Sequence, residues 1–296
     1  MPKASTAPCV QTTRSGPPQT LEERIAAGTL DVPVFPEAAR QLLRACDRDD
    51  CDVTRLAELV RRDPALAAHF LRVANSPLFG GRSAISSLAQ ALARLGSSQT
   101  RRIALLVTTQ ARVFSSKTRA SAGNQLRRQS VANAVWSQEI ARVRRLNVEE
   151  AFLCGLLGDM GIPALWQLAD DDVPAGTTGR DEIAIDHEIA RLHDVVSAGI
   201  ARAWGLPSRV VEIIRLHHAP LEGSDAMALS EPAVVSTVAA VQLADTLARA
   251  TLRGEPCDLA TTRAHPSVAA LSLYDEDVCL LLERSTLVAE AVQVLG

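Results

Sequence analysis

Apolar residues recur at intervals of three and four along most of the chain, which is the spacing of helices that bury one face. The pattern predicts helices over 37–46, 53–62, 64–75, 86–96, 97–114, 129–146, 148–161 and 208–218, a long one around His193, and two or three between 234 and 296. Pro64 suits the first turn of a helix, and Asn75-Ser76-Pro77 and Gly96 suit helix ends.

Composition supports the same class, because aromatic residues make up only 3% of the chain while alanine and leucine dominate. We therefore expect an all-α protein of short helices and short loops. The polar stretch 115–125 separates two helical halves. The expected organisation is a disordered tail over 1–20, an N-terminal lobe over 21–120, a second lobe over 121–225, and C-terminal helices over 226–296 that pack on the second lobe.

Charge and cysteine content narrow the class of protein. The formal net charge of −3 excludes the strong positive field of a dedicated nucleic-acid-binding protein. Six cysteines form no C-x-x-C pair, which favours reduced thiols and a cytoplasmic location. The longest apolar run, 233–248, contains Gln242 and Asp245 and is shorter than the roughly 20 residues that span a bilayer, so no membrane span is expected.

Charge is nevertheless uneven along the chain. Residues 101–145 contain ten basic side chains against Glu139, whereas 159–188 contain eight acidic side chains against Arg180. These regions could face and compensate each other, or the basic one could bind an anionic partner such as a cyclic dinucleotide or a nucleic acid. The best candidates for such a contact are Arg127, Arg128, Arg144 and Arg145.

Several separated motifs follow one another in the order typical of a known family. They are DPALAAHFLRVANSPLFGG, ISSLAQALARLG, RRQSVANAVW, AFLCGLLGDMG, ARLHDVVSAGIARAWGLP and IIRLHH. In this order the chain from Val32 to Pro220 resembles the HDOD family, the HD-related output domains of bacterial signalling proteins. The resemblance implies a two-lobed all-α fold whose second lobe is related to the HD phosphohydrolases, usually without a complete catalytic metal site.

The resemblance also implies where metal ligands would lie. HD hydrolases bind a divalent metal with an early His, an adjacent His-Asp pair and a late Asp. These positions correspond here to Gln129, to Gly158-Asp159, and to Asp245. Gln129 is a poor ligand for a transition metal and Gly158 supplies none, so the motif is degenerate.

A second set corresponds to the additional ion of two-metal relatives: Asp159, His193, His217 and His218. Three imidazoles and a carboxylate would form a credible zinc, manganese or iron site if they converge. The favoured interpretation is that they survive as buried, hydrogen-bonded packing residues. Gly155 and Gly158 are three residues apart, so they are expected to share a helix face on which a neighbouring backbone packs closely.

The resulting expectation is a cytoplasmic, non-enzymatic signal-transduction module that binds another protein and needs no cofactor, with a vestigial site for a divalent metal at most. Two alternatives stay open. One is a metal-dependent phosphohydrolase or phosphodiesterase that acts on a nucleotide through Asp159, His193, His217 and His218. The other is a regulator that binds a cyclic dinucleotide or nucleic acid without hydrolysing it.

Overall fold

The computed structural model describes residues 20–26, 40–41, 45, 53–61, 64–79, 85–112, 119–170 and 182–295. Within these ranges the chain folds into helices and contains no strand, which confirms the all-α class. The expected disordered tail over 1–20 lies outside the described residues except for Thr20, and so does most of the expected loop between 170 and 182.

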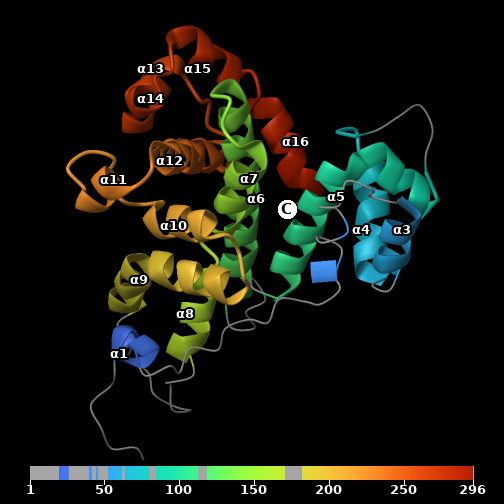
Figure 1. Ribbon diagram of the computed structural model, residues 1–296, viewed down its shortest axis with the longest axis horizontal. Helices are drawn as coiled ribbons and strands as arrows, with labels where there is room; N and C mark the ends of the chain where they lie inside the picture. The colour runs from blue at the N-terminus through green and yellow to red at the C-terminus, as the bar shows by residue number, and fades with distance from the viewer. Residues whose placement is uncertain are drawn as a thin grey trace, which may run out of the picture.

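The first half of the chain contains α1 (Leu21–Ala26), α3 (Val53–Arg61), α4 (Pro64–Ala74), α5 (Leu88–Arg112), α6 (Ala120–Val143) and α7 (Val148–Leu157). The second half contains α8 (Gly161–Asp170), α9 (Glu182–Ala203), α10 (Ser208–Leu216), α11 (Asp225–Leu229), α12 (Pro232–Arg253), α13 (Leu259–Arg263), α14 (Pro266–Ala270), α15 (Asp275–Leu282) and α16 (Ser285–Leu295). Figure 1 shows α3, α4 and α5 on one side of the molecule and the helices from α6 to α15 on the other.

The N-terminal lobe is built from α3, α4 and α5, which pack on one another around Leu56, Phe70 and Leu92. Helix α4 ends at Ala74, directly before Asn75-Ser76-Pro77, as the proline predicts. Gly96 interrupts α5 with φ 75° and ψ 171°. The positive φ was expected of a helix end, but this ψ lies in an extended region that is open essentially to glycine alone.

Helix α6 is the centre of the second lobe, because α7 and α12 both pack along it. Every residue from Ser130 to Ala141 is buried, so this part of α6 is enclosed on all sides. Close packing with α7 depends on Gly155, where an added Cβ would lie 2.6 Å from Ser137 Oγ and 2.9 Å from the Asn133 carbonyl oxygen. The expected backbone approach therefore occurs at Gly155.

Helices α8, α9 and α10 complete this lobe beside α7 and α12, and α1 packs on α8 and α9. The Leu21 side chain is buried there, and its backbone N–H donates to Glu188 of α9. The basic and acidic segments of the chain meet in part, because Arg119 pairs with Asp170 and Asp186. This contact supports mutual compensation between the two charged regions.

Three expectations about helices were wrong. Residues 115–125 were expected to separate the two halves, but α6 begins within this stretch at Ala120, nine residues before the expected start. The helix predicted over 148–161 ends at Leu157, and a turn over 158–160 separates it from α8. From residue 232 onward the structure contains α12, α13, α14, α15 and α16 rather than two or three helices. The short ones begin at local caps, such as Asp258 for α13 and His265 for α14, and they bury too few residues to give a helical period.

Helix α16 returns to the junction of the two lobes and contacts both α6 and α4 (Figure 1). A second link across the junction joins Arg102 of α5 to Glu149 of α7.

The stretch Val148–Asp170 is long and apolar enough to cross a membrane by length and composition. However, 78% of its most apolar window is buried inside the fold. Core segments of soluble proteins pass the same test, so this stretch is weak evidence for a membrane span.

Candidate metal centre

Asp159 lies in the turn between α7 and α8, and α9 packs tightly against the residues that follow it. The N–H of Gly161 donates to Ser197 Oγ of α9 at 2.8 Å. An added Cβ at Gly161 would lie only 2.5 Å from the carbonyl oxygen of His193. This close approach places Asp159 directly beside the His193 side chain.

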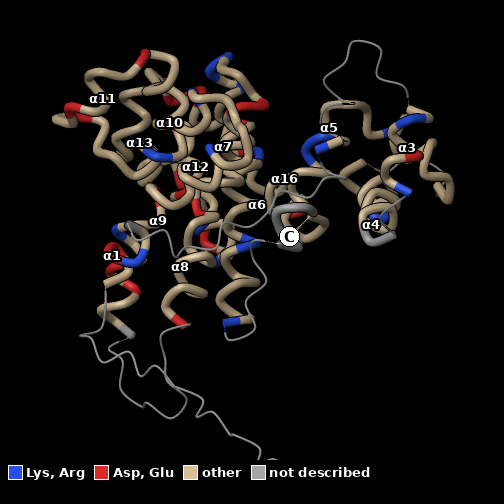
Figure 2. Tube along the Cα trace, turned by 60° about the horizontal axis from the view of Figure 1, so that its bottom comes forward, with Lys and Arg blue, Asp and Glu red and all other residues tan. Residues whose placement is uncertain are grey.

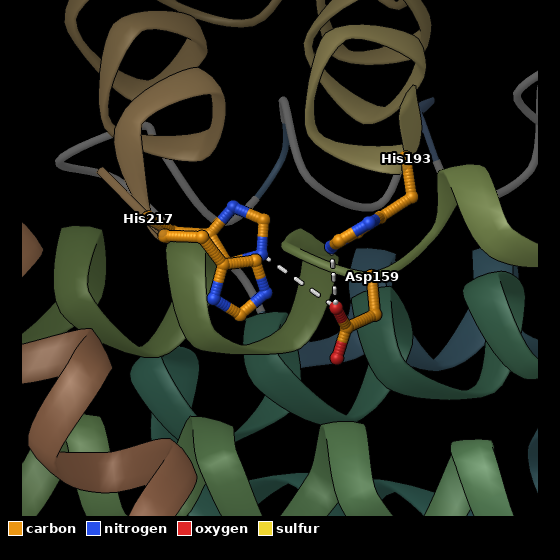
Figure 3. A group of neighbouring side chains, drawn as sticks. Asp159, His193 and His217 are labelled. Atoms are coloured by element: carbon orange, nitrogen blue, oxygen red, sulfur yellow. Dashed lines mark ion pairs between the residues drawn. The ribbon is translucent and has the colours of Figure 1, made fainter. Parts of the chain in front are cut away.

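His193 and His217 point their rings at the same carboxylate oxygen (Figure 3). Nε2 of His193 lies 3.4 Å from Asp159 Oδ1, and Nε2 of His217 lies 3.6 Å from it. Both imidazoles are almost fully buried, so water does not compete freely for these atoms. Neither Nε2 makes a hydrogen bond of normal geometry.

The other nitrogen of each ring decides where its hydrogen lies. Nδ1 of His193 is 2.9 Å from the Ala190 carbonyl oxygen, and Nδ1 of His217 is 2.6 Å from the Ile214 carbonyl oxygen. A carbonyl only accepts, so each Nδ1 carries the hydrogen and donates it. Each neutral ring therefore directs the lone pair of Nε2 at the Asp159 carboxylate, and a proton or a cation must lie between them.

His218 completes the group from the end of α10. Its ring centroid lies 4.0 Å from that of His217 and 5.0 Å from that of His193, and it is the exposed member of the set. One ligand atom from each of Asp159, His193, His217 and His218 lies within 4.8 Å of every other. Ligands of one ion at about 2.1 Å lie at most about 4.2 Å apart, so a small contraction would suffice.

The electrostatics of the cluster also suit a cation. Burial opposes ionisation of Asp159, but the nearby imidazole of His217, with further contributions from His193 and His218, lowers its pKa to about 2. Burial likewise opposes the charged form of His217, yet Asp159 raises the pKa of that ring overall. For His218, partial burial and the charge of His217 lower the pKa to about 3, which keeps its lone pair available at neutral pH. The donor set therefore fits one divalent transition-metal ion.

Gly158 makes room for one of these ligands. An added Cβ there would meet Cδ2 of His217 at 3.3 Å and Nε2 at 3.4 Å. The expected close approach at this position therefore involves the His217 ring instead of a backbone. A side chain at residue 158 would therefore press on the His217 ring.

The residues of the first metal position do not fit an ion. Gln129 donates from Nε2 to Asp245 Oδ1 at 2.9 Å, and Arg249 pairs with Asp245 Oδ2 at 2.7 Å. Burial, opposed by Arg249, raises the pKa of Asp245 above its usual value. Both carboxylate oxygens are thus engaged by protein groups, and Asp245 lies outside the group of four candidate ligands.

The sequence profile of the HDOD domain matches residues 32–220, which is more than half of the chain. The chain belongs to the HDOD domain family.

Solved structures share this HDOD fold over nearly the whole chain. An HDOD domain protein of unknown function from Geobacter sulfurreducens superposes with a TM-score of 0.65 at 22% identity, covering 93% of this chain and 97% of that one. A Shewanella amazonensis SB2B protein, provisionally named a metal-dependent phosphohydrolase, gives 0.68 at 17%, covering 93% and 96%. A Marinobacter aquaeolei VT8 protein, provisionally named a signal transduction protein, gives 0.60 at 18%, covering 96% and 63%.

Among curated proteins, an uncharacterised protein of Treponema pallidum (strain Nichols) is 23% identical over 212 residues, or 68% of this chain. The chain spans only 41% of the length of that relative. At these identities the structural likeness shows the fold alone.

The HDOD chain does not gather its four candidate arginines into one site. Arg127 and Arg128 lie in the first half of α6, about two turns from its start, whereas Arg144 and Arg145 follow its end. At 1.5 Å per residue the two pairs are about 25 Å apart along the helix. Figure 2 shows basic residues on both lobes, without one dominant basic face in that view.

The sequence analysis overlooked Arg249, which neutralises Asp245. The signal was present, because residues four apart on a helix are neighbours and Asp245 precedes Arg249 by four. Ser197, which ties α9 to the turn of Asp159, carried no comparable signal.

Proposed function

We propose that this HDOD protein is a cytoplasmic, non-catalytic regulatory module that acts by contacting another signalling protein, and that its His/Asp cluster binds one divalent transition-metal ion. The observation that carries the proposal is the state of the first metal position. Gln129 and Arg249 occupy the Asp245 carboxylate, and Gly158 offers no ligand. The remaining ligands, Asp159, His193, His217 and His218, are sufficient for a single ion.

When bound, such an ion supplies Lewis acidity and lowers the pKa of a bound water. The chain itself supplies orientation. The carbonyl groups of Ala190 and Ile214 fix the rings of His193 and His217 with Nε2 toward Asp159. A second ion, which would help hold a phosphoryl group, would need the Asp245 carboxylate, and both of its oxygens are already engaged. This favours a structural role for the single ion over a hydrolytic centre.

The first test is the metal content of the purified protein by elemental analysis. We expect about one ion per wild-type chain and none in the His193→Ala, His217→Ala double variant, with circular dichroism confirming that both are folded. A matched control is His187→Ala, which removes an exposed histidine of α9 outside the cluster. Metal-free wild-type protein would contradict the metal part of the proposal.

The second test separates a regulator from an enzyme. Wild-type and Asp159→Asn proteins are incubated with Mn²⁺ and bis-p-nitrophenyl phosphate, and separately with cyclic dinucleotides. Equal, background hydrolysis by both proteins supports the regulatory role. Turnover that is lost in Asp159→Asn would overturn it and establish a metal-dependent phosphohydrolase, the alternative that the convergence of the four ligands favours.

A third test asks whether the role in the cell requires catalysis. In a deletion strain with a measurable phenotype, a gene that carries Asp159→Asn should complement as well as the wild-type gene if catalysis is not required. Binding of a cyclic dinucleotide or nucleic acid is the less favoured function, because the two pairs of candidate arginines are about 25 Å apart along α6. Salt-sensitive binding lost in Arg127→Gln, Arg128→Gln protein would revive it.

A further inference from the structure

A cavity of about 180 Å³ lies at the junction of the two lobes, away from the His/Asp cluster. Helices α5, α6, α7 and α16 and the turn after α4 contribute to its walls. Most of the lining is apolar, including Phe79, Ile103, Leu106, Phe152, Leu287 and Leu295. Concave, mainly apolar cavities with a few placed polar groups are the usual form of small-molecule sites.

The polar groups of this junction cavity form two sets. On one side Arg102 is neutralised by two hydrogen bonds to Glu149. On the other side lies Glu139, a carboxylate whose side chain is only 5% exposed. Glu139 accepts hydrogen bonds from Gln138 and Arg142, and Nε of Arg284 lies 4.0 Å from its second oxygen.

This second set carries a net positive charge, because one carboxylate faces two guanidinium groups. The side chains of Arg142 and Arg284 are 46% and 49% exposed. Arg142 also lines the cavity, so its guanidinium lies at the solvent edge of the cavity. Arg142 uses one terminal nitrogen for Glu139 and has no other partner among the described residues. Its remaining donors are therefore available to one more anionic oxygen.

We propose that the junction cavity binds a small amphipathic monocarboxylate, with its apolar body between the lobes and its carboxylate on Arg142 at the mouth. A cavity of about 150 Å³ accommodates benzene, so the body should contain about six to eight carbons. Charge complementarity supports the head group, since guanidinium and carboxylate form strong charge-assisted hydrogen bonds. This site is independent of the metal centre, and it joins α5, α6 and α16 in one ligand contact.

The test is calorimetric titration of the full chain with octanoate, and with 1-octanol as the uncharged probe of equal length. We expect saturable binding of one octanoate per chain, and a ratio of octanoate to octanol affinity that falls about tenfold in Arg142→Gln, through loss of one charge-assisted contact. The matched control is Arg215→Gln, an exposed arginine on α10 far along the chain from the cavity, which should leave the ratio unchanged.

A cavity-filling variant tests the location. Ala291→Phe places a ring in the cavity from α16 and should abolish octanoate binding, whereas Ala270→Phe on the exposed side of α14 should not. Octanoate binding that is absent in wild type, that has several equivalent sites, or that survives Ala291→Phe would overturn the proposal. An unchanged ratio in Arg142→Gln would also overturn it, and this measurement decides alone if Ala291→Phe does not fold.

Discussion

Gly158 stands where the HD motif has its histidine, and an added Cβ there would lie 3.3 Å from the His217 ring. The absence of a side chain at 158 therefore leaves room for His217, another candidate ligand. A side chain at 158 would be in tight contact with the buried imidazole of His217, and the ring would have to move by a few tenths of an ångström. At this position glycine is a packing requirement of the remaining cluster as well as a lost ligand.

We predict that Gly158→His lowers the affinity for a transition metal at least about tenfold, although it restores the His-Asp pair of the HD motif. The new side chain would press on the His217 ring and shift its Nε2 from the position aimed at Asp159. Each tenfold loss corresponds to about 1.4 kcal/mol. Competition with a metal-binding dye measures the affinity. Binding of two ions per chain by the variant would contradict the prediction.

His69 should make stability depend on acidity. Burial and the charges of Arg72 and Arg127 lower its pKa to about 4 in the folded chain, against about 6.5 when unfolded. Below pH 6.5 His69 binds a proton in the unfolded state but stays neutral in the folded state. The free energy of unfolding therefore falls as the pH drops from 6.5 toward 4.

Urea denaturation at pH 7 and pH 5 measures this effect. Acidification should cost wild-type protein about 2 kcal/mol more than it costs His69→Gln, because the glutamine has no titrating group. An identical loss of unfolding free energy in both proteins would show that His69 binds its proton equally well in the folded chain.

The sequence indicated the ligand types of the cluster but not its geometry. Family motifs brought out Asp159, His193, His217 and His218, which lie within 4.8 Å of one another in space. The tight contact at Gly158 could not be predicted, because it depends on a ring 59 positions later along the chain. The junction cavity was equally hidden, since residues as distant as Phe79 and Leu295 line it together.

At the scale of the element, periodicity and helix ends predicted most of the longer helices, although α6 begins nine residues before its expected start. Pro64 begins α4, and the helix ends before the proline at 77. Gly96 divides the two segments of α5. The short helices from α13 to α15 were beyond this reasoning, because five to eight residues contain too few turns for a face to repeat.

We predict opposite effects for two glycine-to-alanine changes in helices. Gly96→Ala should destabilise the protein by about 1–3 kcal/mol, because φ 75° with ψ 171° is strained for any residue with a Cβ. Gly199 lies inside α9 with open space around its Cβ position, so Gly199→Ala should stabilise by up to about 1 kcal/mol.

Chemical denaturation of the two variants gives both values. Equal effects at the two positions would mean that backbone conformation does not explain the break in α5.

At the scale of the whole molecule, the two lobes are joined through α16 and through the Arg102–Glu149 pair. Arg102 is nearly buried, and its guanidinium carbon lies 5.5 Å from the centroid of the Phe152 ring. Glu149 is more exposed and can be solvated after the pair is broken. The junction therefore combines the Arg102–Glu149 ion pair with the mainly apolar junction cavity that Arg102 lines.

We predict that Arg102→Met loosens this junction and lowers the stability of the N-terminal lobe by about 1–3 kcal/mol. The three tryptophans, Trp136, Trp166 and Trp204, all lie outside that lobe, so their fluorescence reports the second lobe, whereas circular dichroism reports both. In the variant the dichroism transition should begin at lower urea than the fluorescence transition.

Wild-type protein and the exposed control Arg215→Met should show coincident transitions by the two probes. If Arg102→Met also shows coincident transitions at the wild-type midpoint, the pair does not couple the lobes.

The orientation of the two buried rings has a spectroscopic consequence. The Nδ1 hydrogens of His193 and His217 are held by backbone carbonyl groups and shielded from solvent. Their exchange with water should be slow enough for proton resonances that are normally lost to be observed at low field. Nε2 of the same rings faces Asp159, so a metal ion that binds there should shift these two proton resonances first. The two resonances would therefore report whether the site is occupied.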